Sequence, residues 1–183
     1  MGINYLTSMR KAKLFLIAVL ILIGFLCMIT VFLPSHITIS KWVTVNANEN
    51  AVAAQVNDFN NWKNWYPAFQ NKEVTVNISE QDNKAVATLT NKNQKRISLS
   101  LLKSSPENIT ILVSEENGKT KTYQFVLSPN GTGQTQITWN VNMQLGWYPW
   151  RQFAGLFLDK VTGPHSAAAL RNLKIAVENN VPS

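Results

Sequence analysis

Residues 43–67 read VTVNANENAVAAQVNDFNNWKNWYP, and this stretch decides the fold. Its first residues alternate between apolar and polar side chains, as the end of a half-buried strand does. An asparagine-rich turn follows, in which Asn48 and Asn50 are both candidates for the N-cap of a short helix. The stretch closes on two tryptophans and Pro67, which ends the helical segment. We expect this stretch to form the rim of an apolar cavity that later strands and the last helix complete.

Apolar residues at alternate positions predict seven strands in the chain. The first covers residues 36–45. The six later strands are centred on residues 74–78, 85–89, 97–101, 109–113, 123–127 and 137–145. Asp82-Asn83 and Asn117-Gly118 are two-residue turn signals of the kind that join hairpin strands. Consecutive short strands joined by tight turns predict an antiparallel meander.

Helical spacing of apolar residues appears near both ends of this meander. Residues 58–65 carry Phe59, Trp62 and Trp65 at intervals that fit a short helix or turn. Residues 148–177 predict a long C-terminal helix that is interrupted at Gly163-Pro164. The fold class is therefore α+β, because a seven-stranded sheet has an apolar face to cover and this helix is the only large element available. We expect a curved sheet that grips one long helix.

The N-terminal segment differs from the rest in composition. Leu14 to Leu33 has no charged residue, and a helix of that length spans ~30 Å, the thickness of a bilayer core. Three basic residues at positions 10–13 precede it, which places the N-terminus in the cytoplasm. A cleaved signal peptide is the rival interpretation, but its apolar core usually has only ~7–15 residues. We expect a short basic segment (1–13), a transmembrane signal anchor (14–33) and an extracytoplasmic or periplasmic domain (34–183) on the plasma (inner) membrane.

Charge and cysteine content exclude several functions. The net charge is +7, and the residues outside the basic segment carry 14 basic and 10 acidic side chains in scattered positions. A nucleic-acid-binding protein more often has a basic stripe, so no nucleic-acid partner is expected. Cys27 is the only cysteine, which excludes an internal disulfide and a cysteine-based zinc site. The two histidines, His36 and His165, are expected on the surface, and we predict no metal site and no cofactor.

Several short segments resemble a known superfamily. These are Val43–Ala47, residues 56–65 with Pro67, Trp147-Tyr-Pro, Gly163-Pro164, Leu170–Lys174 with Glu178, and the Leu33-Pro34-Ser35 that follows the apolar run. Together they resemble the SRPBCC superfamily, also called START or birch-pollen-allergen-like, and within it the polyketide cyclase/dehydrase-like branch. The resemblance implies a helix-grip fold. It does not imply one activity, because the superfamily includes lipid and hormone carriers as well as cyclases.

The inward-facing positions of the predicted strands carry little acid–base chemistry. No carboxylate or histidine stands at a mid-strand inward position, so a paired-carboxylate or histidine-centred site lacks its parts and no catalytic residue is expected. The inward set is aromatic and soft instead, which suits a hydrophobic ligand. The predicted ligand-binding residues are Trp65, Tyr66, Phe69, Tyr123, Trp139, Met143 and Phe157.

The sequence favours a membrane-anchored domain that binds a hydrophobic small molecule or lipid between the sheet and the C-terminal helix. An enzyme of the cyclase or dehydratase kind is an alternative, which would need Tyr123 paired with Arg151 or Asp58 in one pocket. A second alternative is a module that binds a protein partner. That module would have a filled core and an exposed patch made by Trp147, Tyr148 and Trp150.

Overall fold

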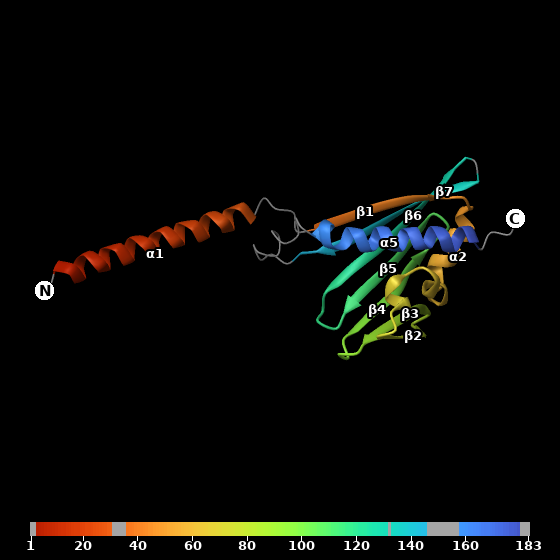
Figure 1. The fold of residues 1–183 in the computed structure, drawn as a ribbon, viewed down its shortest axis with the longest axis horizontal. Coiled ribbons are helices and arrows are strands. Elements are labelled where there is room, and N and C mark those ends of the chain that lie inside the picture. The colour runs from red at the N-terminus through yellow and green to blue at the C-terminus, as the bar shows by residue number, and fades with distance from the viewer. Residues whose placement is uncertain (1–2, 31–35, 132, 146–157, 180–183) are drawn as a thin grey trace. The chain divides into compact units, whose positions relative to one another are not determined.

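A computed structural model describes residues 3–30, 36–131, 133–145 and 158–179. The chain divides into two units. Helix α1 (Ile3–Thr30) belongs to the first. The second comprises residues 36–144 and 157–183, and it contains the sheet and the other helices (Figure 1).

Helix α1 is a single uninterrupted element. Most of its described apolar side chains are exposed, among them Leu14, Ile21 and Phe25. Within the described residues, none of the helices combines the length and the apolar character that crossing a membrane requires. The anchor expected at residues 14–33 therefore gains no support here, and residues 31–33 of that stretch lie outside the described part of the chain.

The second unit is built on one curved, fully antiparallel sheet (Figure 1). Its seven strands lie in the order β1-β7-β6-β5-β4-β3-β2, which confirms the predicted meander. Their bounds are His36–Val45 (β1), Val74–Gln81 (β2), Lys84–Asn91 (β3), Arg96–Ser104 (β4), Asn108–Glu115 (β5), Thr120–Asn130 (β6) and Gln134–Gln144 (β7). The first strand pairs with the last, which leaves β1 and β2 as the two edge strands of the sheet.

Turn chemistry fixes the register of this sheet. Asp82 and Asn83 both have positive φ, 51° and 58°, as a tight two-residue hairpin between β2 and β3 requires. Gly118 has φ 79° in the β5–β6 turn, where a side chain would be strained. The resulting register places odd-numbered residues on the inner face, for example Tyr123, Phe125 and Leu127 of β6. A bulge between Leu101 and Lys103 ends this alternation in β4.

Three short helical elements connect β1 to β2. These are α2 (Glu49–Asn57), the 3-10 helix η1 (Phe59–Asn64) and α3 (Pro67–Gln70). Of the two candidate caps for the first helix, Asn48 is the one used, because its side chain accepts a hydrogen bond from the Ala51 amide at 2.9 Å. Asp58 caps η1 in the same way, by accepting from the Asn60 amide at 2.9 Å.

Helix α5 (Leu158–Asn179) packs along β1 (Figure 1). Its buried face includes Leu170, Leu173 and Val177, in agreement with the predicted helical spacing. The interruption predicted at Gly163-Pro164 is wrong, because the helix continues through Pro164. Proline removes one amide hydrogen bond from a helix. The packing of the residues that follow against the sheet compensates for that loss.

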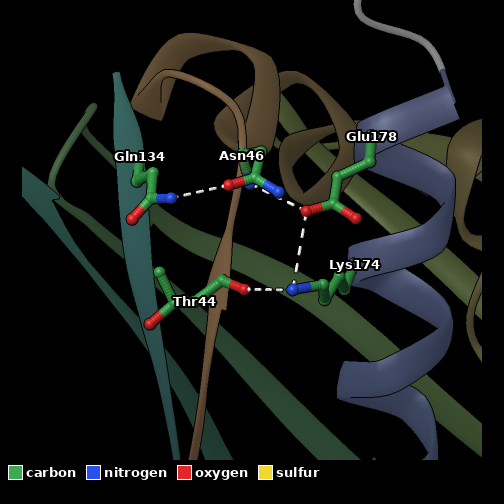
Figure 2. A network of polar contacts seen from close by, with 5 residues as sticks. All are labelled: Thr44, Asn46, Gln134, Lys174 and Glu178. Carbon is green, nitrogen blue, oxygen red and sulfur yellow. Dashed lines mark hydrogen bonds and ion pairs between the residues drawn. The ribbon is translucent and has the colours of Figure 1, made fainter. Parts of the chain in front are cut away.

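A polar network holds the C-terminal half of α5 to the sheet (Figure 2). The Lys174 ammonium donates to the Thr44 carbonyl at 2.8 Å, and its Nζ lies 3.6 Å from Glu178 Oε1. The same Glu178 oxygen accepts from the Asn46 amide at 2.8 Å, and the Asn46 side chain accepts from Gln134 at 2.7 Å. The sequence predicts a weak surface pair for Lys174 and Glu178. The structure instead places both residues, partly buried, between the helix and the ends of β1 and β7.

Candidate functional site

An aromatic cluster fills the space between the short helices and the inner face of the sheet. Trp62 of η1 lies at its centre and contacts the rings of Phe59, Trp65, Tyr66, Phe69 and Phe125, with centroid separations from 4.6 to 6.5 Å. The tight turn of η1 brings Phe59, Trp62 and Trp65 onto one side, as their spacing in the sequence predicts. This cluster forms much of the core of the domain.

The structure brings together most of the predicted ligand-binding residues. Trp65 is 0% exposed, Trp139 is 2% exposed and Tyr123 is 5% exposed, so these three are core residues. Tyr66 and Phe69 are half-buried and lie against each other, with their centroids 5.9 Å apart. The ring contacts among Trp65, Tyr66, Tyr123 and Trp139 make one continuous set.

Two predicted residues lie apart from this set. Met143 is half-buried near the end of β7, where it pairs in register with Ile37 of β1 and Lys121 of β6. Phe157 lies outside the described residues. The other five predicted residues pack against one another. Packing in the core therefore accounts for most of them without a ligand.

The polar centre of the cluster is a pair of phenols. The hydroxyl oxygens of Tyr66 and Tyr123 are 3.1 Å apart and share a hydrogen bond. Burial raises the pKa of both phenols, and that of Tyr66 rises well above its ordinary value. The two hydroxyls therefore stay protonated near neutral pH and act as hydrogen-bonding groups, not as bases.

The indoles of the cluster differ in their hydrogen bonding. Trp62 Nε1 donates to the Val56 carbonyl at 2.9 Å, and Trp65 Nε1 donates to the Gln55 carbonyl at 3.3 Å. Trp139 Nε1 is buried and has no hydrogen-bond partner among the described residues. Buried donors without partners are uncommon, because the lost hydration of such a group costs about 1–3 kcal/mol.

One end of the sheet is hollowed. We call it the mouth end: β1, β2, β4 and β6 begin there, and β3, β5 and β7 end there. The main depression at this end has a volume of about 750 Å³. Ala68, Val74, Leu89 and Ile97 give it an apolar floor.

Charged side chains surround that floor. The ion pairs of its rim are Lys92–Glu73, with 2.6 Å between Nζ and the carboxylate oxygen, and Arg96–Glu116, at 3.9 Å. A minor depression of about 360 Å³ lies at the same end between β1, β6 and β7, and Ile37, Lys121 and Met143 contribute to it.

Sequence analysis missed Lys121 as a functional candidate. The residue is half-buried on the inner face, two positions before Tyr123, and its Nζ lies 5.6 Å from the centroid of that ring. Its odd number in a strand whose odd residues face inward is the signal that would have found it. The floor residues Ala68, Leu89 and Ile97 were missed too, because an apolar residue in a strand or helix gives no sign of being near an opening.

The described residues offer little for acid–base catalysis. Asp58 caps η1 and Tyr123 pairs with Tyr66, so these contacts do not supply the Tyr123–Asp58 pair that the enzyme alternative would need. The other partner proposed for Tyr123, Arg151, lies outside the described residues, as does the patch of Trp147, Tyr148 and Trp150. Among the described residues, no group of three or more His, Cys, Asp or Glu side chains is placed to hold a metal ion. His36 and His165 are exposed, as predicted.

This combination of sheet, helix and inner aromatic cluster corresponds to a known protein family. The model of the family described as "Polyketide cyclase / dehydrase and lipid transport" matches residues 36–178. The chain belongs to this family. The match confirms the polyketide cyclase/dehydrase-like resemblance on almost the whole of the domain. No curated protein matches the sequence.

Solved structures of similar fold are numerous, and the following three are distant in sequence. An aromatase/cyclase from a Streptomyces species, Zhui, has a TM-score of 0.60 at 15% identity, over 81% of this chain and 97% of that one. A protein of unknown function from Staphylococcus aureus has a TM-score of 0.58 at 12% identity, over 79% and 94%. The di-domain aromatase/cyclase StfQ of steffimycin biosynthesis has a TM-score of 0.57 at 13% identity, over 79% and 51%. At these identities the likeness shows the helix-grip fold of the polyketide cyclase/dehydrase family and no specific activity.

Proposed function

We propose that the domain binds a hydrophobic small molecule or lipid on the inner face of the sheet, and that the ligand reaches this site through the mouth end. The observation that carries the proposal is the apolar floor of the main depression, which lies within a rim of charged residues. The volume of about 750 Å³ is within the range of roughly 300–1,000 Å³ that small-molecule sites occupy. Membership of a family whose description includes lipid transport supports the same proposal.

The energetics of the mouth end favour an apolar ligand with a polar head. Burial of apolar ligand surface on Ala68, Leu89 and Ile97 stabilises a complex by roughly 25 cal/mol for each Å² removed from water. The charged rim stays solvated and already forms ion pairs, so it contributes little to affinity. Specificity must therefore come from polar groups deeper on the inner face.

A cyclase or dehydratase activity is the second candidate. Two of the proteins with a similar fold, Zhui and StfQ, are aromatase/cyclases, which favours it. The absence of a mid-strand carboxylate or histidine on the described inner face weighs against it. Binding without catalysis is the simpler proposal for a site whose central groups are two protonated phenols.

The test is to purify the full chain gently from its own host, extract it, and identify co-purified molecules by mass spectrometry. Ala68→Phe fills part of the floor of the main depression, whereas the matched variant Ala167→Phe acts at a separate depression between β1 and α5. We expect a hydrophobic molecule to co-purify with the wild type and with Ala167→Phe, and to be depleted from Ala68→Phe. An extract without any hydrophobic molecule, from a protein that also takes up no fluorescent fatty-acid probe, would overturn the proposal.

We also propose that the chain is held at the plasma (inner) membrane by residues 14–33, with the N-terminus in the cytoplasm and the domain outside it. The support is the uncharged run itself, the basic residues Arg10, Lys11 and Lys13 before it, and the exposure of the apolar side chains that α1 carries. Such an anchor would keep the domain close to a source of hydrophobic molecules.

Fractionation and protease digestion test this location. We expect the full chain in the membrane fraction, resistant to carbonate extraction, and the domain degraded when protease is added to spheroplasts. A variant with Ile21→Lys and Leu22→Lys in the apolar run should appear in the soluble fraction, because each central lysine opposes insertion by about 2.5–3.5 kcal/mol. A wild-type chain that is soluble, or a domain that resists protease outside the cell, contradicts the proposal.

A further inference from the structure

The aromatic cluster and the neighbouring Lys121 carry several hydrogen-bond donors. In the Tyr66–Tyr123 pair one hydroxyl donates to the other, which leaves one phenolic hydrogen for a third partner. Lys121, two residues along β6, adds an ammonium group that has three donors and no acceptor. A ligand group that accepts hydrogen bonds therefore meets complementary chemistry here.

Trp139 gives independent support. It is 2% exposed, and its centroid lies 5.0 Å from the ring of Tyr123 and 6.2 Å from that of Tyr66. The cluster satisfies the indole donors of Trp62 and Trp65 with backbone carbonyls, but within the described residues the donor of Trp139 has no partner. An unpaired donor beside two phenols indicates that the fold keeps this group for an acceptor that is not part of the protein.

The three carboxylates that line the main depression already have partners: Glu73 pairs with Lys92, Glu116 pairs with Arg96, and Glu115 accepts a hydrogen bond from Asn117. Burial raises the pKa of the Tyr123 phenol most, the hydrogen bond with Tyr66 lowers it, and the charge of Glu115 contributes to raising it. Glu115 stands at the end of β5, half-buried, at the edge of the main depression. A cationic ligand head would therefore meet carboxylates that already have partners, whereas an oxygen acceptor would have the phenol pair, an indole and an ammonium.

We propose that Tyr66, Tyr123, Trp139 and Lys121 form the recognition site for the oxygen of a carbonyl or carboxylate group on the hydrophobic ligand. This inference rests on the proposed binding function, and it narrows the ligand class to hydrophobic carboxylic acids and ketones. The phenols and the indole serve the oxygen of either group. Lys121 adds a preference for the carboxylate, because a hydrogen bond between charged partners is roughly twice as strong as a neutral one.

The test compares ligands of similar chain length on the full chain held in phospholipid nanodiscs. Decanoate, 2-undecanone and decylamine each compete against a bound fluorescent apolar probe. We expect decanoate and 2-undecanone to displace the probe at concentrations about tenfold lower than decylamine, since one or two good hydrogen bonds are worth that factor. Tyr66→Phe and Tyr123→Phe should each reduce the preference to about twofold while the probe itself still binds.

Two lysine substitutions distinguish carboxylate ligands from ketone ligands. Lys121→Met should weaken decanoate about tenfold and leave 2-undecanone unchanged. The matched control Lys119→Met removes the same charge from an exposed position in the adjoining turn, and it should leave both ligands unchanged. Thermal melts of each variant verify that it is folded.

The outcomes are distinguishable. If no apolar probe binds to the wild type, the proposed function itself fails. If the probe binds and decylamine displaces it as well as decanoate, the binding function stands and the recognition site is refuted. The recognition site is likewise refuted if folded Tyr66→Phe and Tyr123→Phe retain the wild-type preference.

Discussion

Alkaline pH should destabilise the domain through the buried phenols. Burial raises the folded-state pKa of Tyr66 and Tyr123, while in the unfolded chain each phenol titrates near its ordinary value of about 10. The phenols therefore stabilise the fold fully below about pH 10. That contribution is lost as the pH rises toward the folded-state pKa, because the unfolded state releases protons that the folded state retains.

The size of the effect follows from this difference. Above about pH 10, each phenol lowers the free energy of unfolding by about 1.4 kcal/mol for every pH unit, as long as the folded state stays protonated. Between about pH 8 and about pH 11, one such phenol removes about 1.4 kcal/mol. The lysines titrate in the same range, so the phenol contribution has to be obtained as a difference between variants.

The assay is urea denaturation of the wild type, Tyr66→Phe, Tyr123→Phe and the double variant, followed by tryptophan fluorescence at several pH values. The loss of stability between about pH 8 and about pH 11 should be smaller by about 1.4 kcal/mol in Tyr66→Phe and by up to that amount in Tyr123→Phe. Trp42→Phe removes no titratable group from an exposed site and should keep the wild-type pH dependence. Parallel curves for the wild type and the double variant would refute the burial of the phenol pair.

Other substitutions test the rest of the fold. Trp62→Ala should lower the free energy of unfolding by about 3–5 kcal/mol, because the side chain is 0% exposed at the centre of the cluster. The control Trp42→Ala, at a residue 68% exposed, should change it by less than about 0.5 kcal/mol. Equal effects of the two substitutions would contradict the assigned core. Lys174→Met should lower the free energy of unfolding by about 1 kcal/mol, because it removes the hydrogen bond to the Thr44 carbonyl. Arg171→Met, on the exposed side of α5, should leave it unchanged. If urea denaturation shows the larger loss for Arg171→Met, the network of Figure 2 does not stabilise the fold. Gly118→Ala should cost about 1–2 kcal/mol, because its φ of 79° strains any side chain, and a neutral result would mean that the turn has another conformation.

The sheet was predictable because its signals are local. Alternation sets the faces of strands such as β6, and turn residues such as Asn117-Gly118 set where the chain reverses. Each of these features depends on a few neighbouring residues, so the sequence predicts seven strands and the antiparallel meander from β2 to β7, whereas the pairing of β1 with β7 joins distant segments and was not predicted.

The C-terminal helix shows where local rules fail. Gly163-Pro164 predicts a break, but α5 continues through it, because packing of Leu170, Leu173 and Val177 on the sheet outweighs one lost hydrogen bond. The weak surface pair predicted for Lys174 and Glu178 fails for a similar reason. Both residues are partly buried, and their further partners are the Thr44 carbonyl in β1 and the Asn46 amide just after β1, which are distant in the sequence.

The candidate site was only partly predictable. Tyr123 and Trp139 were identified correctly as inward-facing, since both are buried, whereas Trp65 belongs to the stretch predicted as the rim and lies fully buried in the core. Whether an inward ring lines a cavity or fills the core depends on how several rings pack together, which no spacing rule reports. The same limit hid the opening at Ala68 and Leu89, because a depression arises from the ends of several strands and not from one segment.

The central claim is that a hydrophobic ligand binds inside the domain at the mouth end, and the indole of Trp139 reports on it most directly. The full chain in nanodiscs, labelled with ¹⁵N at its six tryptophans, gives one indole signal for each, and Trp139→Phe and Trp42→Phe identify two of them. On addition of decanoate, the account predicts a clear shift of the Trp139 signal and no shift of the exposed Trp42 signal. A ligand that binds, by displacement of the fluorescent probe, and leaves the Trp139 signal in place would contradict it.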